Sequence, residues 1–114
     1  MSRMKQTPHI FGKDEPVVQA GPGITRKVLS YSEQMMICQI RLEKGAVLPA
    51  HAHPHEQSTT VISGKLSYTV GEETKEVTNG DSVWLAPNMP HGVAALEDTL
   101  AIDVFVPLRE DFLP

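Results

Sequence analysis

Residues 45–64 read GAVLPAHAHPHEQSTTVISG, and this stretch carries the most informative pattern in the chain, a run of histidines between two glycines. His51 and His53 are two residues apart, and side chains of an extended strand repeat every two residues, so both imidazoles are expected on one face. Neutral imidazoles suit Zn, Ni, Fe and Cu, and a side-chain oxygen such as that of Gln57 completes a mixed nitrogen and oxygen ligand set. The run therefore predicts a site for one metal ion.

A second segment, residues 80–91, reads GDSVWLAPNMPH and ends on a third histidine, His91. Each histidine taken alone is better explained as an ordinary turn or edge residue, whereas three of them near bracketing glycines favour a shared metal ion. His55 is expected beside the site or in solvent. Glu56 is expected on the opposite side of an extended strand, unless the strand bulges there.

Apolar residues recur with a period of two far more often than with a period of 3.6, which indicates strands rather than helices. The expected strands are residues 36–42, a strand that ends at 61–64, then 65–70, 74–77, 82–85 and 100–106. Turn signals such as Glu43-Lys44-Gly45 and Asn79-Gly80-Asp81 separate them. Many short strands with turns at intervals of about 8–12 residues predict an all-β sandwich or barrel, without an amphipathic helix of three turns.

The length of 114 residues fits a single domain. Residues 1–22 contain Pro8, Pro16 and Pro22, so they are expected to form an irregular arm that can contribute one edge strand. Residues 23–114 then form the barrel. The arm could cross to a neighbouring copy of the chain, because the sheet edges of a small barrel need cover.

Composition excludes several classes of function. The net charge of −4 and the absence of a Lys/Arg cluster argue against nucleic acid as a partner. No apolar run reaches the length of a signal peptide or a membrane span, so the cytoplasm is the expected location and no membrane partner is expected. The single cysteine, Cys38, allows no disulfide framework and is expected to be a buried small hydrophobe. Ten further residues are expected in the core or an interface: Met35, Met36, Leu42, Val61, Leu66, Tyr68, Val70, Trp84, Leu85 and Leu96.

The strand expected at residues 100–106 places Asp103 on one face together with Ala101 and Phe105. An aspartate between apolar neighbours is costly to bury without a partner. Arg109 could reach Asp103, or a bound carboxylate, as a bidentate clamp. Two alternatives stay open: a structural ion pair at the barrel rim, and a solvated tail at residues 109–111.

The two histidine segments resemble the paired motifs of the cupin family. The spacing of the first motif is matched by Gly45, His51, His53, Gln57 and Gly64, and that of the second by Gly80, Asp81 and His91. Gln57 stands where glutamate is usual, and Ala86 and Asn88 replace the proline and glycine of the second motif. Asparagine tolerates a left-handed turn, so Asn88 is an acceptable replacement. The resemblance implies a small single-domain jelly-roll barrel, also called a double-stranded β-helix, and a homodimer. It also implies a metal site at the barrel mouth with the ligands His51, His53, Gln57 and His91.

A longer similarity, from about Gly23 to Leu113, is to the KdgF family of pectin-degradation cupins. Residues 51–57, 87–92 and 103–112 carry it. It implies a redox-neutral lyase or isomerase that opens 4,5-unsaturated uronates, released from pectin or alginate, to the linear 4-deoxy-5-keto-uronate. The partner would be a small anionic sugar and the cofactor one divalent Ni, Zn, Mn or Fe ion. The family's active-site residues correspond to Asp103, Phe105 and Arg109.

A metal-dependent dioxygenase and a non-catalytic sugar-binding protein are the alternatives on the same scaffold. A divalent ion with three histidines and Gln57 keeps a charge of about +2, against about +1 with glutamate, which favours an anionic ligand and disfavours oxidation of the metal. A binding protein has no need of an inward aspartate such as Asp103. Both features favour ring opening over the alternatives.

Overall fold

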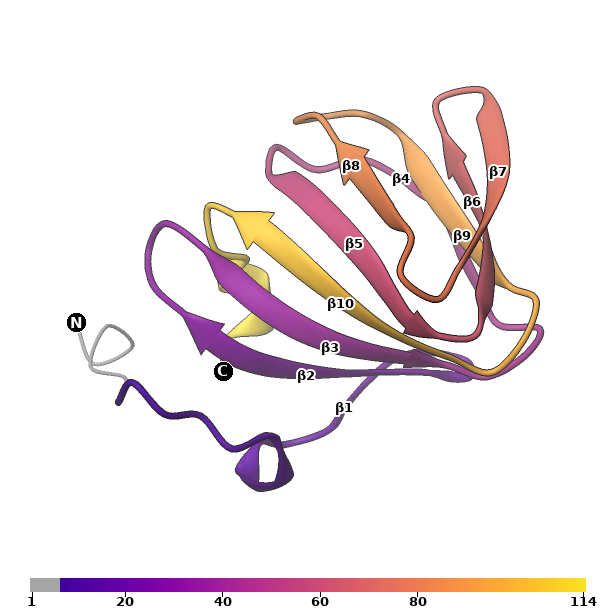
Figure 1. The fold of residues 1–114 in the computed structure, drawn as a ribbon. Helices are drawn as coiled ribbons and strands as arrows, with labels where there is room; N and C mark the ends of the chain where they lie inside the picture. Colours follow the sequence, from indigo (N-terminus) through magenta and orange to yellow (C-terminus); the bar gives the residue numbers. More distant parts are fainter. Residues whose placement is uncertain (1–6) are drawn as a thin grey trace.

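The computed structural model describes residues 7–114, which form two antiparallel sheets facing each other in a jelly-roll barrel (Figure 1). The strands are β1 (Val18–Gly21), β2 (Ile24–Tyr31), β3 (Met36–Leu42), β4 (Val47–His51), β5 (Glu56–Ser63), β6 (Lys65–Val70), β7 (Glu73–Thr78), β8 (Ser82–Leu85), β9 (His91–Ala95) and β10 (Thr99–Val106). One sheet has the order β1-β2-β3-β10-β5-β8 and the other the order β4-β9-β6-β7. Within the described range the helical segments are two 3-10 turns, η2 (Gly12–Asp14) and η3 (Glu110–Phe112). The all-β jelly-roll prediction is confirmed.

The expected strands are present where alternation is clear. β3, β6 and β8 have the expected bounds. β7 is one residue longer at each end than expected, β10 begins one residue earlier, and β5 ends at Ser63 within the expected range of 61–64. The pattern missed β2, β4 and β9 as strands. Every residue of β2 after Ile24 is half-buried, and nearly all of β9 is buried, so neither alternates. β4 contains Pro49, which sequence reasoning treats as a strand breaker.

Two apolar clusters fill the barrel. The larger packs residues of both sheets, among them Leu42, Val61 and Leu66. The smaller joins Met36, Cys38, Phe105 and Leu108. Burial raises the pKa of the Cys38 thiol to about 12, so this cysteine is a packed, protonated side chain as expected.

The residues predicted for the core or an interface fall into two groups. Met36, Leu42, Val61, Leu66, Tyr68 and Leu85 are buried, and Val70 is half-buried against the larger cluster. Met35, Leu96 and Trp84 are 39%, 37% and 62% exposed, so they do not belong to the core. Trp84 lies on the outer side of the edge strand β8, where the alternation of side chains continues although no segment among residues 7–114 buries it.

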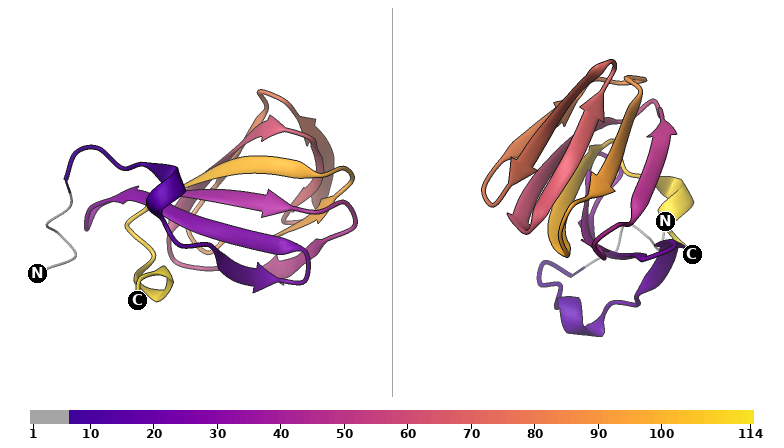
Figure 2. Two further views of the ribbon diagram at one scale, coloured as in Figure 1. Left: turned by 90° about the horizontal axis from the view of Figure 1, so that it is seen from below. Right: turned by 90° about the vertical axis from the view of Figure 1, so that its right-hand side faces the viewer.

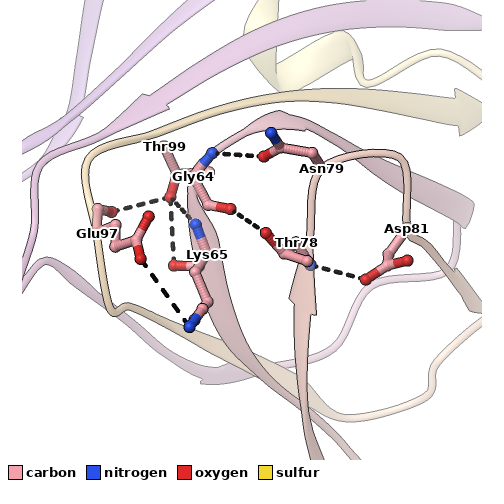
Figure 3. Close-up of polar contacts among 7 residues, drawn as sticks. All are labelled: Gly64, Lys65, Thr78, Asn79, Asp81, Glu97 and Thr99. Carbon is pink, nitrogen blue, oxygen red and sulfur yellow. Dashed lines mark hydrogen bonds and ion pairs between the residues drawn. The ribbon is translucent and has the colours of Figure 1, made fainter.

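The end of the barrel around Gly64 is closed by short polar contacts (Figure 3). Gly64 has a φ of +105°, and a Cβ there would overlap the Asp98 carbonyl oxygen and Thr99 Oγ1. Its N–H donates to Asn79 Oδ1 at 3.0 Å, and its carbonyl accepts from Thr78 Oγ1 at 2.8 Å. Only glycine fits this joint between β5 and β6.

Residues 7–17 lie outside the barrel (Figures 1 and 2). The Gly12 carbonyl of η2 accepts a hydrogen bond from Lys27 Nζ at 2.8 Å, which fixes η2 against the outer face of β2. β1 pairs with β2 at the edge of the six-stranded sheet. Part of the arm expected at residues 1–22 lies outside the described residues, which begin at Thr7. Among residues 7–114, no helix has the length and apolar character needed to cross a membrane.

Candidate functional site

Three histidines meet at the end of the barrel opposite Gly64. His51, the last residue of β4, is the direct antiparallel partner of His91, the first residue of β9, and their ring centroids are 4.3 Å apart. The ring of His53 lies 5.8 Å from that of His51 and 5.0 Å from that of His91. One ligand nitrogen from each ring lies within 4.8 Å of the others. The structure thus brings together the three histidines that the sequence singled out.

His53 reaches this cluster by a different route from the one expected. β4 ends at His51, so His53 lies in the connection to β5 and not beside His51 on one strand. The Asn88 N–H donates to the His53 carbonyl at 2.8 Å and holds this connection in place. Asn88 has a φ of +64°, which confirms the left-handed turn expected where it replaces glycine. A turn of the second histidine segment therefore positions a ligand of the first.

Each of the three rings has its Nδ1 next to a backbone carbonyl. The distances are 2.9 Å from His51 to Pro49, 3.1 Å from His53 to His55 and 2.8 Å from His91 to Met89. A carbonyl only accepts hydrogen bonds, so Nδ1 of His51 and of His91 donates its proton and Nε2 of each keeps a lone pair. His53 has an acceptor at both ring nitrogens, and its Nε2 keeps a lone pair when the proton is on Nδ1. Hydrogen bonds of this kind orient histidines that bind metals.

Burial keeps two of these rings neutral. It lowers the pKa of both His53 and His91, and the Arg109 charge lowers the pKa of His53 further. The buried Nε2 of His91 has no hydrogen-bond partner among residues 7–114. A buried lone pair without a donor is unfavourable in a folded protein, and a metal ion would satisfy it. The histidines therefore fit a bound metal.

Gln57 fits as the fourth ligand. It is 6% exposed on β5, and its Oε1 lies 2.9 Å from His53 Nε2. Both atoms carry lone pairs when His53 donates through Nδ1, so they repel each other unless they share a cation. At 2.9 Å the two atoms are close enough to bind the same ion.

A hydrogen-bond chain fixes the orientation of the Gln57 amide. Thr59 Oγ1 donates its one proton to Asp103 Oδ1 at 2.7 Å, so it must accept from Gln57 Nε2 at 3.1 Å and from the Tyr68 hydroxyl at 3.0 Å. The amide oxygen of Gln57 is then left facing the histidines. The same residue thus connects the candidate metal site to Asp103.

Asp103 is half-buried on the inner face of β10. Burial raises the pKa of its carboxyl from 3.8 to about 6, while hydrogen bonds from Thr59 and Gln57 and the charge of Arg109 act in the opposite direction. A carboxyl with a pKa near neutrality can both accept and return a proton. Asp103 is therefore suited to acid–base chemistry.

Phe105 and Arg109 also line the pocket, but the expected clamp on Asp103 is wrong. Arg109 donates from Nε and Nη2 to both carboxylate oxygens of Asp111, at 3.1 Å and 2.9 Å. This ion pair lowers the pKa of Asp111. Arg109 and Asp111 are only two residues apart in the chain, at the start of η3. Their ion pair therefore forms more readily than a bond from Arg109 across the pocket to Asp103. Arg109 is half-buried at the pocket, whereas Glu110 and Asp111 at the start of η3 are exposed to solvent.

The residues around the site enclose a cavity of about 190 Å³. Its lining includes two residues that sequence reasoning missed, Arg26 and Phe112, besides Thr59 and Tyr68. Clefts for drug-sized ligands measure ~300–1,000 Å³, so this cavity suits a smaller molecule. Thr59 could have been found from its spacing of two from Gln57 on one strand. Arg26 has no such local signal, because only the strand order places it near β10.

His55 and Glu56 lie outside the histidine cluster. The Glu56 carboxylate accepts a hydrogen bond from Trp84 Nε1 at 2.7 Å on the outer face of the sheet, as expected for a regular strand. The His55 ring is hydrogen-bonded to the backbone of Leu108, and burial lowers its pKa. Among the described residues, the cluster of nitrogen and carboxylate ligands contains His51, His53 and His91 alone.

Comparison with known proteins agrees with this architecture. Residues 39–106 match the protein family described as "Cupin domain". The chain is 33% identical over 107 residues to the pectin degradation protein KdgF of Dickeya dadantii (strain 3937), a match that covers 92% of this chain and 97% of that protein. An RmlC-like cupin from Shewanella frigidimarina NCIMB 400 has a similar structure, with a TM-score of 0.92 and 32% identity over 96% of this chain and 99% of its own. KdgF from Halomonas sp. has a TM-score of 0.90 and 29% identity over 95% of this chain and 100% of its own.

Proposed function

The chain belongs to the cupin family, and from this premise we propose that it opens the ring of 4,5-unsaturated uronate monosaccharides to give the linear 4-deoxy-5-keto-uronate. The product would arise in the breakdown of pectin or alginate. The similarity to a protein named for pectin degradation supports this substrate class. The small cavity supports a monosaccharide over a polymer.

The observation that carries the proposal is the position of Asp103. Its carboxyl, with a pKa of about 6, is connected through Thr59 to Gln57, and Gln57 faces the three histidines. This reaction requires proton transfer and stabilisation of negative charge, and the presence of residues suited to each in one pocket supports the proposal.

His51, His53, Gln57 and His91 would hold one divalent ion, with Ni, Zn, Mn and Fe as the candidates. Such an ion supplies a Lewis acid for the oxygen atoms of the substrate. Because Gln57 is neutral, the site keeps the full charge of a divalent ion, which suits an anionic sugar acid.

The reaction is redox-neutral and needs no external nucleophile. Asp103 takes the proton of the anomeric hydroxyl, the C1 carbonyl forms, and the bond from C1 to the ring oxygen breaks. The electrons of that bond pass to the ring oxygen as an enolate of C4 and C5. The enolate collapses to the C5 ketone when C4 receives a proton, which Asp103 returns. One carboxyl thus moves the proton between two positions, a role worth ~10²–10⁴-fold in rate.

Phe105 and Arg109 position the substrate. The ring of Phe105 is 2% exposed beside the histidines, 5.9 Å from His53 between centroids, and forms an apolar wall for the sugar. The guanidinium carbon of Arg109 lies 5.1 Å from the Phe105 ring centroid. From there Arg109 contributes positive charge near Asp103 and the sugar carboxylate.

The test is to load the pure protein with each candidate metal and add an unsaturated uronate monomer. The ultraviolet absorbance of the conjugated double bond should fall, and NMR should show the keto product. Elemental analysis should find about one metal ion per chain. Uptake of dioxygen would instead indicate a dioxygenase, and binding without turnover would indicate a sugar-binding protein; either result refutes the proposal.

A homodimer is the proposed assembly. The outer faces of β5, β8 and β10 carry Ile62, Trp84 and Val106, which are 49%, 62% and 46% exposed. Large apolar side chains gathered on one sheet face favour a second protein surface. Sedimentation should give a dimer, and Ile62→Glu should shift it toward monomer; a monomeric wild-type chain would refute this assembly.

A further inference from the structure

Arg26 differs from the other arginine of the pocket, Arg109, because it makes no bidentate bond to a carboxylate within the part of the chain that the structure describes. It lies on β2, which belongs to the six-stranded sheet, and its side chain lines the same cavity as His51, Gln57 and Asp103. The Nε of Arg26 is buried and has no hydrogen-bond partner among residues 7–114. A buried N–H of a charged group without an acceptor is unfavourable, so it indicates a missing partner.

The surroundings of Arg26 increase this cost. Its guanidinium carbon lies 3.6 Å from the centroid of the Phe112 ring, and that of Arg109 lies 4.2 Å from the same centroid. Burial and the charge of Arg109 both lower the pKa of Arg26. Arg109 is compensated by the bidentate bond to Asp111, whereas Arg26 stacks on Phe112 and feels the Asp111 charge without a hydrogen bond to it.

A purely structural role for Arg26 explains why its guanidinium stacks on Phe112. It does not explain why its buried Nε has no hydrogen-bond acceptor among residues 7–114. Stacked arginines stay charged, and their N–H groups point outward in the ring plane, where an acceptor can lie. In this pocket no side chain supplies that acceptor within the described range. A ligand with a planar pair of oxygens would.

The order of the strands places such a ligand between two fixed points. In the six-stranded sheet the sequence β2-β3-β10-β5 puts Asp103 of β10 between Arg26 of β2 and Gln57 of β5. A molecule that contacts Arg26 at one side and the histidine site at the other would pass over Asp103. This arrangement sets the orientation in which the reacting atoms reach the carboxyl.

We propose that Arg26 binds the carboxylate of the anionic sugar and so makes the pocket selective for uronates over neutral sugars. The identity of the ligand rests on the proposed function. The carboxylate would accept a fork of hydrogen bonds from the guanidinium while Phe112 holds the guanidinium plane. Arg26 is a binding residue in this scheme, and Asp103 keeps the proton transfer.

Kinetics of the metal-loaded full-length chain test the role. For Arg26→Gln, KM should rise about 10–100-fold, the usual effect of losing a charged hydrogen-bonded pair, with kcat changed little. Arg26→Lys keeps the charge but not the fork, so its KM should be intermediate. The control is Arg41→Gln, an exposed arginine on β3 outside this cavity, which should behave as wild type. An unchanged KM in Arg26→Gln overturns the proposal; if that variant does not fold, an unchanged KM in Arg26→Lys does so.

Calorimetric binding of D-glucuronate and D-glucose separates this proposal from the proposed function. Wild type should prefer glucuronate, and Arg26→Gln should lose the preference. If wild type shows the preference and Arg26→Gln loses it, but wild type does not open the unsaturated uronate, the proposed function fails and the role of Arg26 stands. If wild type opens the uronate but Arg26→Gln keeps KM and the preference, the role of Arg26 fails alone. Equal binding of both sugars by wild type also overturns it.

Discussion

The two ends of the barrel treat polar groups in opposite ways. At the end drawn in Figure 3, backbone and side-chain groups of Gly64, Thr78, Asn79 and Asp81 bond to one another within the chain. Around the pocket, three buried nitrogens have no partner in the described part of the chain: Arg26 Nε, His55 Nδ1 and His91 Nε2. Unpaired buried polar atoms are rare in folded proteins, so their concentration in and beside the pocket identifies where ligands complete the structure.

The two ends of the barrel should also differ in how substitutions affect stability and turnover. Residues 57 and 64 mark the two ends along β5, about 23 Å apart at the rise of an extended strand. Substitutions at the closed end should change the free energy of unfolding and leave turnover per folded molecule unchanged. Substitutions at the open end should change turnover, and should change the free energy of unfolding only where they remove a buried ionisable group. Four substitutions test this division, beginning with the largest expected effect.

Asp103→Asn should lower the rate of ring opening ~10²–10⁴-fold, because it removes the group that moves the proton. The fall in ultraviolet absorbance of the unsaturated uronate measures the rate. Metal content by elemental analysis should equal that of wild type, since Asp103 is not a proposed ligand. Wild-type turnover in this variant would remove Asp103 from the mechanism.

The stability of the same variant gives an independent check in metal-free protein. The pKa of Asp103 is raised on folding, so protonation of its carboxyl favours the folded state. Below pH ~3.8 the carboxyl is protonated in both states and does not lower the free energy of unfolding. As pH rises through about 6, ionisation of the buried carboxyl lowers the free energy of unfolding of wild type. Asparagine does not ionise. Asp103→Asn should therefore gain stability relative to wild type between pH 4 and pH 7 in urea unfolding. A gain that does not depend on pH would contradict the burial of the carboxylate.

Gly64→Ala should lower the free energy of unfolding by about 2–5 kcal/mol, through a left-handed backbone and a Cβ that meets the Asp98 carbonyl. Gly45→Ala is the matched control: Gly45 has a φ of +91° with no atom within 4 Å of an added Cβ, so only about 1–2 kcal/mol is expected. Chemical denaturation measures both. Equal losses of stability in the two variants would show that the contact of a Cβ at position 64 with Asp98 contributes nothing. A loss of turnover in folded Gly64→Ala would contradict the expectation that the closed end affects stability alone.

Gln57→Glu should retain the metal, raise KM for the anionic substrate about 10-fold and shift the acidic limb of kcat/KM to higher pH. In wild type that limb belongs to Asp103 and should lie at or below pH 6, because a bound cation lowers the pKa of a nearby carboxyl. A glutamate at position 57 loses the donor to Thr59 and adds negative charge next to Asp103, so the pKa of Asp103 rises. A pH–rate profile identical to that of wild type, or improved catalysis, would contradict the charge argument.

The sequence could predict the parts of this site that depend on local spacing. His51, His53, Gln57 and His91 stand at motif positions, and Asp103 stands out as a charge within an apolar strand. Each of these signals lies within one short segment. The strands in which apolar and polar residues clearly alternate were predicted for the same reason, because alternation is also visible within one short segment.

The missed parts depend on register between distant strands. Asp103 meets Thr59 because β10 and β5 are paired with these two residues opposite each other, 44 positions apart in the chain. Arg26 enters the pocket because β2 lies two strands from β10. The pairing of Arg109 with Asp111 required knowing that the chain turns into η3. Such relations follow from the fold and not from any local pattern.

The smallest expected effect is at Thr99, the buried first residue of β10 at the closed end. Its Oγ1 accepts from the Lys65 N–H at 3.1 Å and donates to the Glu97 carbonyl at 2.9 Å. Valine has nearly the same shape but neither bond, so Thr99→Val should lower the free energy of unfolding by about 1 kcal/mol. Thr99→Ser keeps the hydroxyl and should recover most of the loss.

Turnover by Thr99→Val tests whether this loss of stability at the closed end also affects the chemistry at the open end. The hydroxyl of Thr99 serves only the joint between strands, whereas that of Thr59 donates to Asp103. Ring opening per folded molecule and its pH dependence should therefore stay at wild-type values in Thr99→Val. A changed pH–rate profile would mean that the closed end is coupled to Asp103 along β10, because the two residues share that strand. The open end would then depend for its chemistry on the hydrogen bonds that close the other.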